Sequence, residues 1–248
     1  MKETKIAALA LDPIEKKPLY HFYPGSAVLS VGFYGCNMHC PFCQNHDISQ
    51  TTDAYAPDDS RFITPEALTD LARSYKKNGN IGVAYTYNEP LTKWEFVRDT
   101  GKLVHEAGMK NVLVTNGSLP ERILDAVLPR MDAMNVDIKS FDAEYYREVL
   151  KGRLEYVKAF IEKAVAACHV ELTTLIIPGE NDSDAEMREI TGWIHEMEQK
   201  NGKAIPYHIS RFFPRFRYSD RTPTPVETVY HLVDVAKERL KYVYPGNC

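Results

Sequence analysis

Cys36-Asn-Met-His-Cys40-Pro-Phe-Cys43 places three thiols within eight residues of the chain. Residues 27–33 before them are apolar and rich in valine, and turn residues bound them on both sides, a pattern typical of a buried strand. The cysteines are therefore predicted to lie on the loop that leaves a strand. Because they are close in sequence, their thiolates can converge on one metal centre without help from distant residues.

The absence of a fourth nearby cysteine narrows the kind of metal centre. A 4Fe-4S cubane has four irons, so three protein thiolates leave one iron free to bind a substrate or cofactor directly. A structural zinc site is the alternative, and His39 or His46 could complete its shell. Zinc sites commonly join two paired half-sites, however, and the sequence holds no second cysteine pair. The spacing therefore favours the cluster.

Downstream of this loop, short β-rich runs alternate with helical runs. Strands are predicted at residues 81–86, 111–115, 133–138 and 169–177, and helices at 91–107, up to 130, 143–150 and 155–167, with two more opening at Ser183 and Thr224. Such alternation implies right-handed βαβ units, and about six units imply a full or partial barrel of parallel strands. No linker divides the chain, so residues 1–248 are predicted to form one domain with its chemistry at the C-terminal ends of the strands.

The spacing Cys36-x-x-x-Cys40-x-x-Cys43, with aromatic Phe42 before the last cysteine, resembles the signature of the radical S-adenosylmethionine (radical SAM) superfamily. The resemblance implies a partial (β/α)6 TIM-like barrel, three cysteines on a 4Fe-4S cluster, and Phe42 beside the cofactor. The amino and carboxylate groups of S-adenosylmethionine would chelate the fourth iron. One electron would then cleave this cofactor to methionine and a 5′-deoxyadenosyl radical, while the protein supplies orientation and excludes solvent.

Residues 35–45 are similar to the activating enzymes of glycyl-radical enzymes such as pyruvate formate-lyase. Blocks that start at residues 23, 85, 135, 173, 208 and 242 resemble the radical SAM member of the AmmeMemoRadiSam group. The resemblance implies an activating-enzyme-like oxidoreductase that abstracts hydrogen from a protein glycine, with an electron donor such as flavodoxin or ferredoxin. Two alternatives stay open: a radical SAM enzyme acting on a small molecule or peptide, and a zinc-stabilised binding module without redox chemistry.

The resemblance also assigns residues after the second and third strands to the cofactor. Similar enzymes receive the amino group of S-adenosylmethionine at the segment that corresponds to Asn88 and Glu89, and a carboxylate is suited to that contact. A glutamate that merely begins a helix is the alternative for Glu89. Thr115 and Asn116 could face the cofactor's carboxylate or sugar. Val114 stands where activating enzymes often carry an acid, so the resemblance does not extend to a bound monovalent cation.

Asp137 and Lys139 end the fourth predicted strand, and strand alternation places them on the same side of the sheet. The resemblance implies that both help to bind S-adenosylmethionine and shape the substrate face, with His208 on the sixth strand joining them. The alternative is an Asp–Lys pair inside the barrel together with a core histidine.

A basic and aromatic run follows the sixth strand and comprises Arg211, Phe212, Phe213, Arg215, Phe216, Arg217 and Tyr218. It could grip a substrate carboxylate or a loop of a partner protein, or be a solvated loop. Arginines interleaved with aromatic residues can also bind nucleic acid, but the net charge of −4 argues against that partner.

The composition is that of an ordinary globular protein, with 44% hydrophobic and 26% charged residues. The five cysteines are too few for a disulfide scaffold and predict reduced thiols. Cys168 is predicted to be a buried apolar thiol and Cys248 an exposed one, so this chain alone cannot build a second four-cysteine cluster. No apolar run reaches the length of a membrane span, so the protein is expected to be cytoplasmic, with no membrane partner.

Overall fold

The computed structural model describes residues 3–248 and contains an eight-stranded sheet with the order β10-β9-β8-β7-β6-β5-β3-β2. All neighbouring pairs from β10 to β3 are parallel, and β2 pairs antiparallel with β3. The strands of this sheet are β2 (Ala8–Pro13), β3 (Ala27–Gly32), β5 (Asn80–Tyr85), β6 (Lys110–Thr115), β7 (Ala133–Asp137), β8 (His169–Ile176), β9 (Tyr207–Arg211) and β10 (Val243–Gly246). A second small sheet pairs β1 (Thr4–Ile6) with β4 (Arg61–Ile63).

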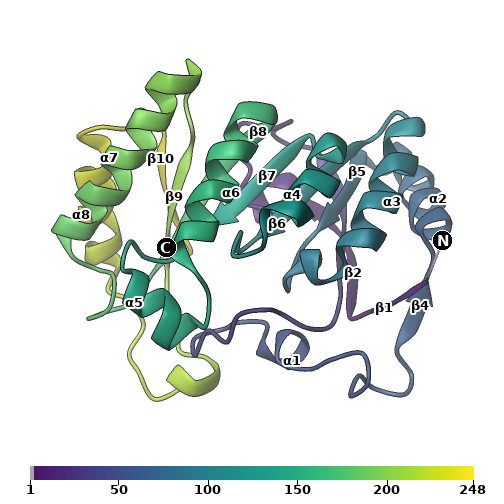
Figure 1. Ribbon diagram of the computed structural model, residues 1–248, viewed down its shortest axis with the longest axis horizontal. Coiled ribbons are helices and arrows are strands. Elements are labelled where there is room, and N and C mark those ends of the chain that lie inside the picture. The colour runs from purple at the N-terminus through teal and green to yellow at the C-terminus, as the bar shows by residue number, and fades with distance from the viewer. Residues whose placement is uncertain (1–2) are drawn as a thin grey trace.

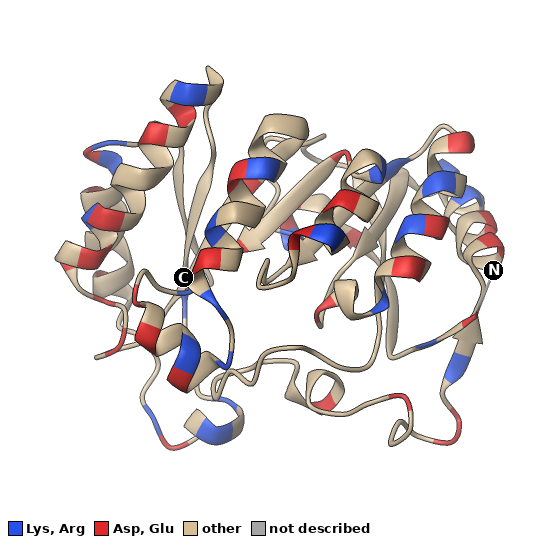
Figure 2. Cartoon of the chain, in the orientation of Figure 1, with Lys and Arg blue, Asp and Glu red and all other residues tan. Residues whose placement is uncertain are grey.

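Helices connect the parallel strands and cover one face of the curved sheet (Figure 1). The longer helices are α2 (Pro65–Ser74), α3 (Trp94–Glu106), α4 (Glu121–Val127), α6 (Leu154–Ala167), α7 (Asp184–Asn201) and α8 (Val226–Lys237). Short turns are α1 (His46–Ser49), α5 (Ala143–Tyr145), the π-helical turn Tyr146–Leu150 and the 3-10 turns Ile14–Lys16, Lys76–Asn78, Pro90–Lys93, Leu128–Arg130 and Phe216–Tyr218. Charged residues are spread along the outer helices (Figure 2), while the apolar faces of these helices pack on the sheet.

Local sequence explains where the longer helices begin. The Thr64 side chain accepts a hydrogen bond from Ala67 N before α2, and Pro65 occupies the first helical position. Ser183 accepts from Glu186 N before α7, as predicted.

The inner face of the sheet has its own small apolar core inside the barrel. Val28, Ala84, Val112 and Ala133 supply it from four neighbouring strands, and Ile14 and Leu19 reach it from the segment between β2 and β3. We call residues 14–23 of that segment the plug. Because the plug fills the amino end of the barrel, the carboxyl ends of the strands are left to form a site.

The α/β fold with parallel strands is confirmed, and β3 together with β5 to β9 corresponds to the six predicted strands. The predicted helix 91–107 begins at Trp94 instead, because the 3-10 turn Pro90–Lys93 precedes it. The predicted helix 143–150 is a short α-turn followed by a π-turn. Four strands were not predicted, namely β1, β2, β4 and β10. Of these, β10 adds a parallel edge strand, where Pro245 is tolerated. The single-domain assignment stays a prediction. Within the described residues, every helix is too short or too polar to span a bilayer.

Candidate active site

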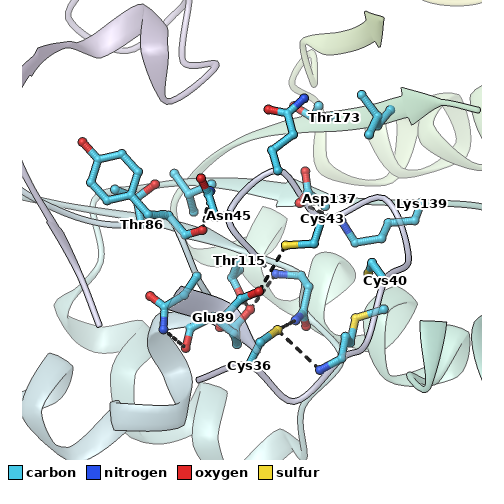
Figure 3. Close-up of a pocket in the computed structure, with 18 of the residues that line it drawn as sticks. Cys36, Cys40, Cys43, Asn45, Thr86, Glu89, Thr115, Asp137, Lys139 and Thr173 are labelled. Atoms are coloured by element: carbon cyan, nitrogen blue, oxygen red, sulfur yellow. Dashed lines mark hydrogen bonds and ion pairs between the residues drawn. The ribbon is translucent and has the colours of Figure 1, made fainter. Parts of the chain in front are cut away.

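A cavity of about 320 Å³ lies at the carboxyl ends of the strands, and the loop that follows β3 forms part of its wall (Figure 3). Its walls combine the three cysteines of that loop with the residues that end β5, β6, β7 and β8. The predicted residues that line it are Cys36, Cys40, Phe42, Cys43, Asn88, Glu89, Thr115, Asn116, Asp137 and Lys139. The structure thus brings ten of the eleven predicted site residues together, and His208 is the exception.

The cysteine loop is fixed where it leaves the sheet. Gly35 has a φ of +98°, a backbone conformation that favours glycine, and directly precedes Cys36. Asn88 holds this turn with both ends of its amide: Phe33 N donates to its Oδ1 at 3.1 Å, and its Nδ2 donates to Gly35 O at 2.7 Å. Asn88 therefore positions the loop.

Two further asparagines tie the cysteine loop to the rim of the barrel. Asn37 Nδ2 donates to Ser118 O at 2.7 Å, and Asn45 Nδ2 donates to Tyr87 O at 2.6 Å. Tyr87 has a φ of +74°, which is uncommon for a residue with a side chain and marks local strain. These contacts fix the loop at both ends of the cysteine motif.

Cys40 is buried and Cys36 and Cys43 are half-buried, and two of the three thiols make hydrogen bonds. Met38 N donates to Cys36 Sγ at 3.4 Å, and Cys43 Sγ and Ser49 Oγ lie 3.1 Å apart. Burial raises the pKa of Cys36 to about 12 and that of Cys40 to about 11. A metal that binds here must displace these protons, because thiolates are the ligands.

Among residues 3–248, no three His, Cys, Asp or Glu side chains converge closely enough to hold a single metal ion. A mononuclear zinc site, the alternative from the sequence, needs that convergence. The thiolates of a cubane bind separate irons and therefore surround a wider space. The three thiols around one cavity fit a 4Fe-4S cluster better than a zinc ion.

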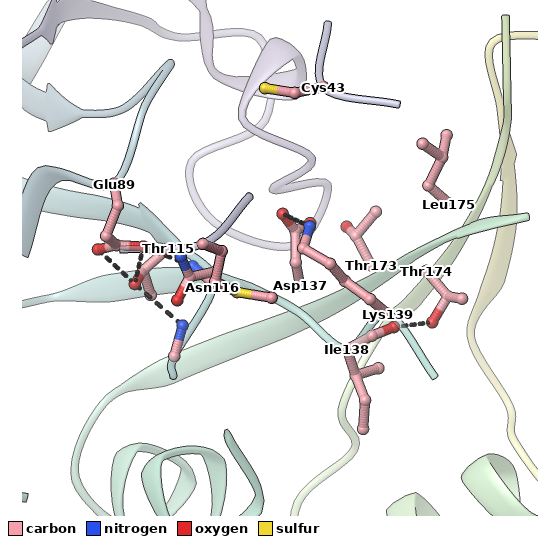
Figure 4. A network of polar contacts seen from close by, with 12 residues as sticks. Cys43, Glu89, Thr115, Asn116, Asp137, Ile138, Lys139, Thr173, Thr174 and Leu175 are labelled. Carbon is pink, nitrogen blue, oxygen red and sulfur yellow. Dashed lines mark hydrogen bonds and ion pairs between the residues drawn. The ribbon is translucent and has the colours of Figure 1, made fainter. Parts of the chain in front are cut away.

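Glu89 lies beside the cysteine loop and is only 1% exposed (Figure 4). Its carboxylate accepts from Thr115 Oγ1 at 2.8 and 2.9 Å, from Asn116 N at 2.8 Å and from Leu91 N at 3.0 Å. Burial raises the pKa of Glu89 to about 7, although these neutral donors favour its charged form. Glu89 also caps the 3-10 turn through Leu91, so the structural alternative holds in part, yet its carboxylate lines the cavity.

Asp137 and Lys139 lie on the same side, as predicted, with Lys139 Nζ and Asp137 Oδ2 3.0 Å apart (Figure 4). Burial alone would lower the pKa of Lys139, but the neighbouring Asp137 carboxylate outweighs it and raises this pKa above its ordinary value. Lys139 is therefore a permanent cation in the cavity wall.

His208 does not line the cavity. It lies deeper in the barrel, where its Nε2 is 2.7 Å from Glu171 Oε2, and its side chain is 3% exposed. Glu171 also lies 2.9 Å from His169 Nε2 and accepts from Tyr20 N and His21 N of the plug. The structure thus places His208 in a buried network that ties the plug to the sheet, away from the predicted cofactor residues.

The cavity is also lined by residues that no sequence pattern singled out. Lys17 of the plug lines it, although this side chain is only 2% exposed and donates to Asp12 Oδ2 at 2.8 Å. Tyr87 donates to the same carboxylate oxygen at 2.5 Å. Burial lowers the pKa of Lys17, while its contact with Asp12 opposes that shift. A lysine next to another lysine is expected to be exposed, so the burial of Lys17 could not be predicted from its neighbours in the sequence and depends on long-range packing.

Comparison with known proteins agrees with this geometry. Residues 30–190 match the Radical SAM superfamily. The chain is 42% identical over 247 residues to the "Uncharacterized protein MJ0808" of Methanocaldococcus jannaschii, covering 98% of this chain and 70% of that relative. It is 26% identical over 186 residues to pyruvate formate-lyase 1-activating enzyme of Escherichia coli K12, covering 71% and 72% of the two chains.

The crystal structure of Streptococcus suis SuiB bound to S-adenosylmethionine has a TM-score of 0.66 against this chain at 12% identity. It covers 89% of this chain and 52% of that chain, a likeness that shows the fold. The chain belongs to the radical SAM superfamily, a class of enzymes with radical redox chemistry. Membership implies S-adenosylmethionine and a 4Fe-4S cluster as cofactors.

Proposed function

We propose that Cys36, Cys40 and Cys43 hold a 4Fe-4S cluster and that the rim of the barrel binds S-adenosylmethionine beside it. The observation that carries this proposal is that three thiols, the buried Glu89 carboxylate and the Lys139 cation surround one cavity, and that Glu89 has no cationic partner among residues 3–248. When bound, the cluster supplies the electron that splits S-adenosylmethionine to a 5′-deoxyadenosyl radical, which removes a hydrogen atom from the substrate.

The cavity offers one charged side chain for each charged group of the methionine part of S-adenosylmethionine. Glu89 accepts hydrogen bonds from the amino group, while Lys139 lies ready for the carboxylate. Thr115 and Asn116 hold the Glu89 carboxylate in place through the hydrogen bonds described above, so the acceptor is oriented before the cofactor arrives. Asp137 fixes the direction of the Lys139 side chain.

Apolar side chains from the cysteine loop complete the site. Met38 and Phe42 line the cavity and are 1% and 4% exposed. They shield the thiols from bulk water, which protects a radical from side reactions.

For the substrate, we favour a glycine of a partner protein, as in activating enzymes. The similarity to pyruvate formate-lyase 1-activating enzyme supports this choice at 26% identity. An electron donor such as flavodoxin or ferredoxin would serve the cluster. A small molecule or a peptide is the second candidate substrate, and the residues that line the cavity do not distinguish between these two.

Anaerobically reconstituted protein with S-adenosylmethionine and a strong reductant tests the core of the proposal. Wild-type protein should release 5′-deoxyadenosine, Cys40→Ala should release none above background, and Cys168→Ala should match wild type because Cys168 lies outside the cavity. Protein with a full cluster that binds S-adenosylmethionine but never cleaves it, with or without candidate substrates, would contradict the proposal. Colourless protein with one zinc would instead support the binding module.

Electron paramagnetic resonance tests the substrate class separately. A glycyl radical on a candidate partner after turnover would support the activating role. Absence of that signal on every candidate, with deuterium transferred from a labelled small molecule or peptide into 5′-deoxyadenosine, would overturn it in favour of the second candidate.

A further inference from the structure

The basic and aromatic run after β9 packs directly on the cysteine loop. Arg217 N donates to Pro41 O at 3.0 Å, and the Phe216 ring stacks on His46 with a centroid distance of 4.8 Å. The Tyr218 ring lies 6.1 Å from Phe42, the residue beside Cys43. The turn Phe216–Tyr218 therefore covers the outer side of the loop that carries the three thiols.

The segment that contains this turn, residues 211–221, is strongly basic, whereas the chain as a whole is acidic. Residues 211–221 contain four arginines and one aspartate, whereas the chain carries a formal charge of −4. The turn carries this basic charge at the lower edge of the molecule (Figure 2), close to the cysteine loop. The positive charge of residues 211–221 thus lies next to the loop that carries the predicted cluster ligands.

Two of these arginines are available to a partner. Arg215 and Arg217 are exposed, and among the ion pairs of residues 3–248 neither one takes part. Arg221, by contrast, is held by Glu180 at 2.5 Å. Arg217 lies over the Phe216 ring at 5.2 Å, which orients its guanidinium without neutralising it.

We propose that the exposed face of residues 211–221, which we call the arginine turn, is the docking surface for an acidic one-electron carrier protein. The proposal rests on the proposed function, since only a redox centre on the cysteine loop needs an electron there. Transfer of an electron between proteins falls steeply with distance, and the arginine turn is a basic surface in direct contact with the cysteine loop. The donor loses one electron and this protein gains one, with no atom exchanged.

The physical basis is electrostatic steering. A patch of unpaired positive charge raises the association rate of a partner of opposite charge by about 10- to 1000-fold at low salt, and added salt weakens the effect. Electron-transfer complexes are small and short-lived, so a few charges suffice to orient them.

The double variant Arg215→Glu/Arg217→Glu, in cluster-loaded protein, tests the proposal with flavodoxin as the probe. Its matched control is Lys77→Glu/Lys237→Glu, which changes the net charge equally but precedes β5 and β10, at the opposite end of the barrel. Binding of oxidised flavodoxin is measured at low and high salt. Reduction of the cluster by reduced flavodoxin is followed spectroscopically.

We expect the arginine variant to bind flavodoxin and accept its electron about tenfold more weakly and slowly than the control at low salt. The difference should shrink at high salt. Photoreduced deazariboflavin, a small carrier that needs no docking surface, should reduce all forms equally. The milder Arg215→Gln/Arg217→Gln variant should give an intermediate rate, which excludes misfolding as the cause.

Equal rates for the arginine variant and its control would overturn the docking surface, provided that deazariboflavin still drives 5′-deoxyadenosine release. A loss confined to a protein substrate, with flavodoxin binding unchanged, would overturn it in favour of a substrate-gripping role. No 5′-deoxyadenosine from any form with deazariboflavin would overturn the proposed function, and the docking surface with it.

Discussion

Two glutamates inside the barrel show how burial leads to opposite outcomes at its two ends. Glu89 lies at the carboxyl ends of the strands and is 1% exposed; Glu171 lies near the amino end of β8 and is 0% exposed. Burial disfavours both charges to begin with. Yet the pKa of Glu89 rises to about 7, whereas the pKa of Glu171 falls to about 2.

The partners of each carboxylate account for the difference. For Glu171, contacts with His169 and His208 and the backbone N–H groups of His21 and Tyr20 outweigh the effect of burial. Glu89 receives only neutral donors and has no cationic partner among the described residues. A buried carboxylate that is paired with histidines stabilises the fold. A buried carboxylate that has no cation beside it is suited to bind a positively charged ligand.

Removing the charge of Glu171 should have the largest effect on the fold. Glu171→Gln leaves His208 and the plug without their shared acceptor and should cost about 3–5 kcal/mol in the free energy of unfolding, measured in urea. Glu89→Gln is the matched control and should cost less than half as much, because the charge of Glu89 is poorly stabilised in the folded state.

The low pKa of Glu171 also makes the stability of the fold depend on pH in acid. The folded-state pKa of Glu171 lies below its ordinary value of 4.5, so its contribution is complete above pH 4.5 and is lost as the pH falls toward 2. Glu171→Gln should therefore show a shallower loss of stability over that range. Equal stability of wild type and Glu171→Gln at neutral pH would refute the structural role.

Glu89→Gln should act mainly on the cofactor. Loss of a charge-assisted acceptor should weaken S-adenosylmethionine binding to the cluster-loaded protein by about 10- to 100-fold at pH 8. Equilibrium binding measurements check this, with cluster content as the control. In Glu171→Gln, the folded fraction should keep its affinity.

Thr115→Val should give the smallest effect. It removes the hydroxyl that donates to both oxygens of Glu89, so the carboxylate loses about 1 kcal/mol of support and cofactor binding should weaken about fivefold. Thr115→Ser keeps the hydroxyl and should bind as wild type does. If Val and Ser behave alike, the hydroxyl does not support Glu89.

The sequence predicted the features that depend on neighbouring residues. The strand before Cys36, the alternation of strands and helices and the shared side of Asp137 and Lys139 all follow from local periodicity, and the structure contains them. The strands near the two ends of the chain were harder to predict. β2 carries the charged residue Asp12, and β10 is only four residues long and contains a proline. Such strands are set by the neighbours they pair with.

Site residues follow the same rule: those in local motifs were predicted, and those placed by contacts between distant segments were not. His208 was assigned to the cofactor, but its partner Glu171 lies 37 residues earlier and no local pattern joins the two. Lys17 lies at the cavity because its ammonium pairs with Asp12 and contacts the ring of Tyr87, which is 70 positions later in the chain. Contacts of this kind depend on how distant segments pack, and spacing in the sequence does not record them.

The most direct test of the contrast between the two glutamates is cofactor affinity as a function of pH. S-adenosylmethionine binding is measured from pH 6 to 8 for wild type and Glu89→Gln, both loaded with the cluster. The cofactor's own amino group titrates in this range, so the ratio of the two affinities isolates Glu89. Because the pKa of Glu89 is about 7 before the cofactor binds, this ratio should rise with pH through 7 as the carboxylate becomes charged. A ratio that stays at one from pH 6 to 8 would contradict the assignment of Glu89 as the acceptor for the cofactor.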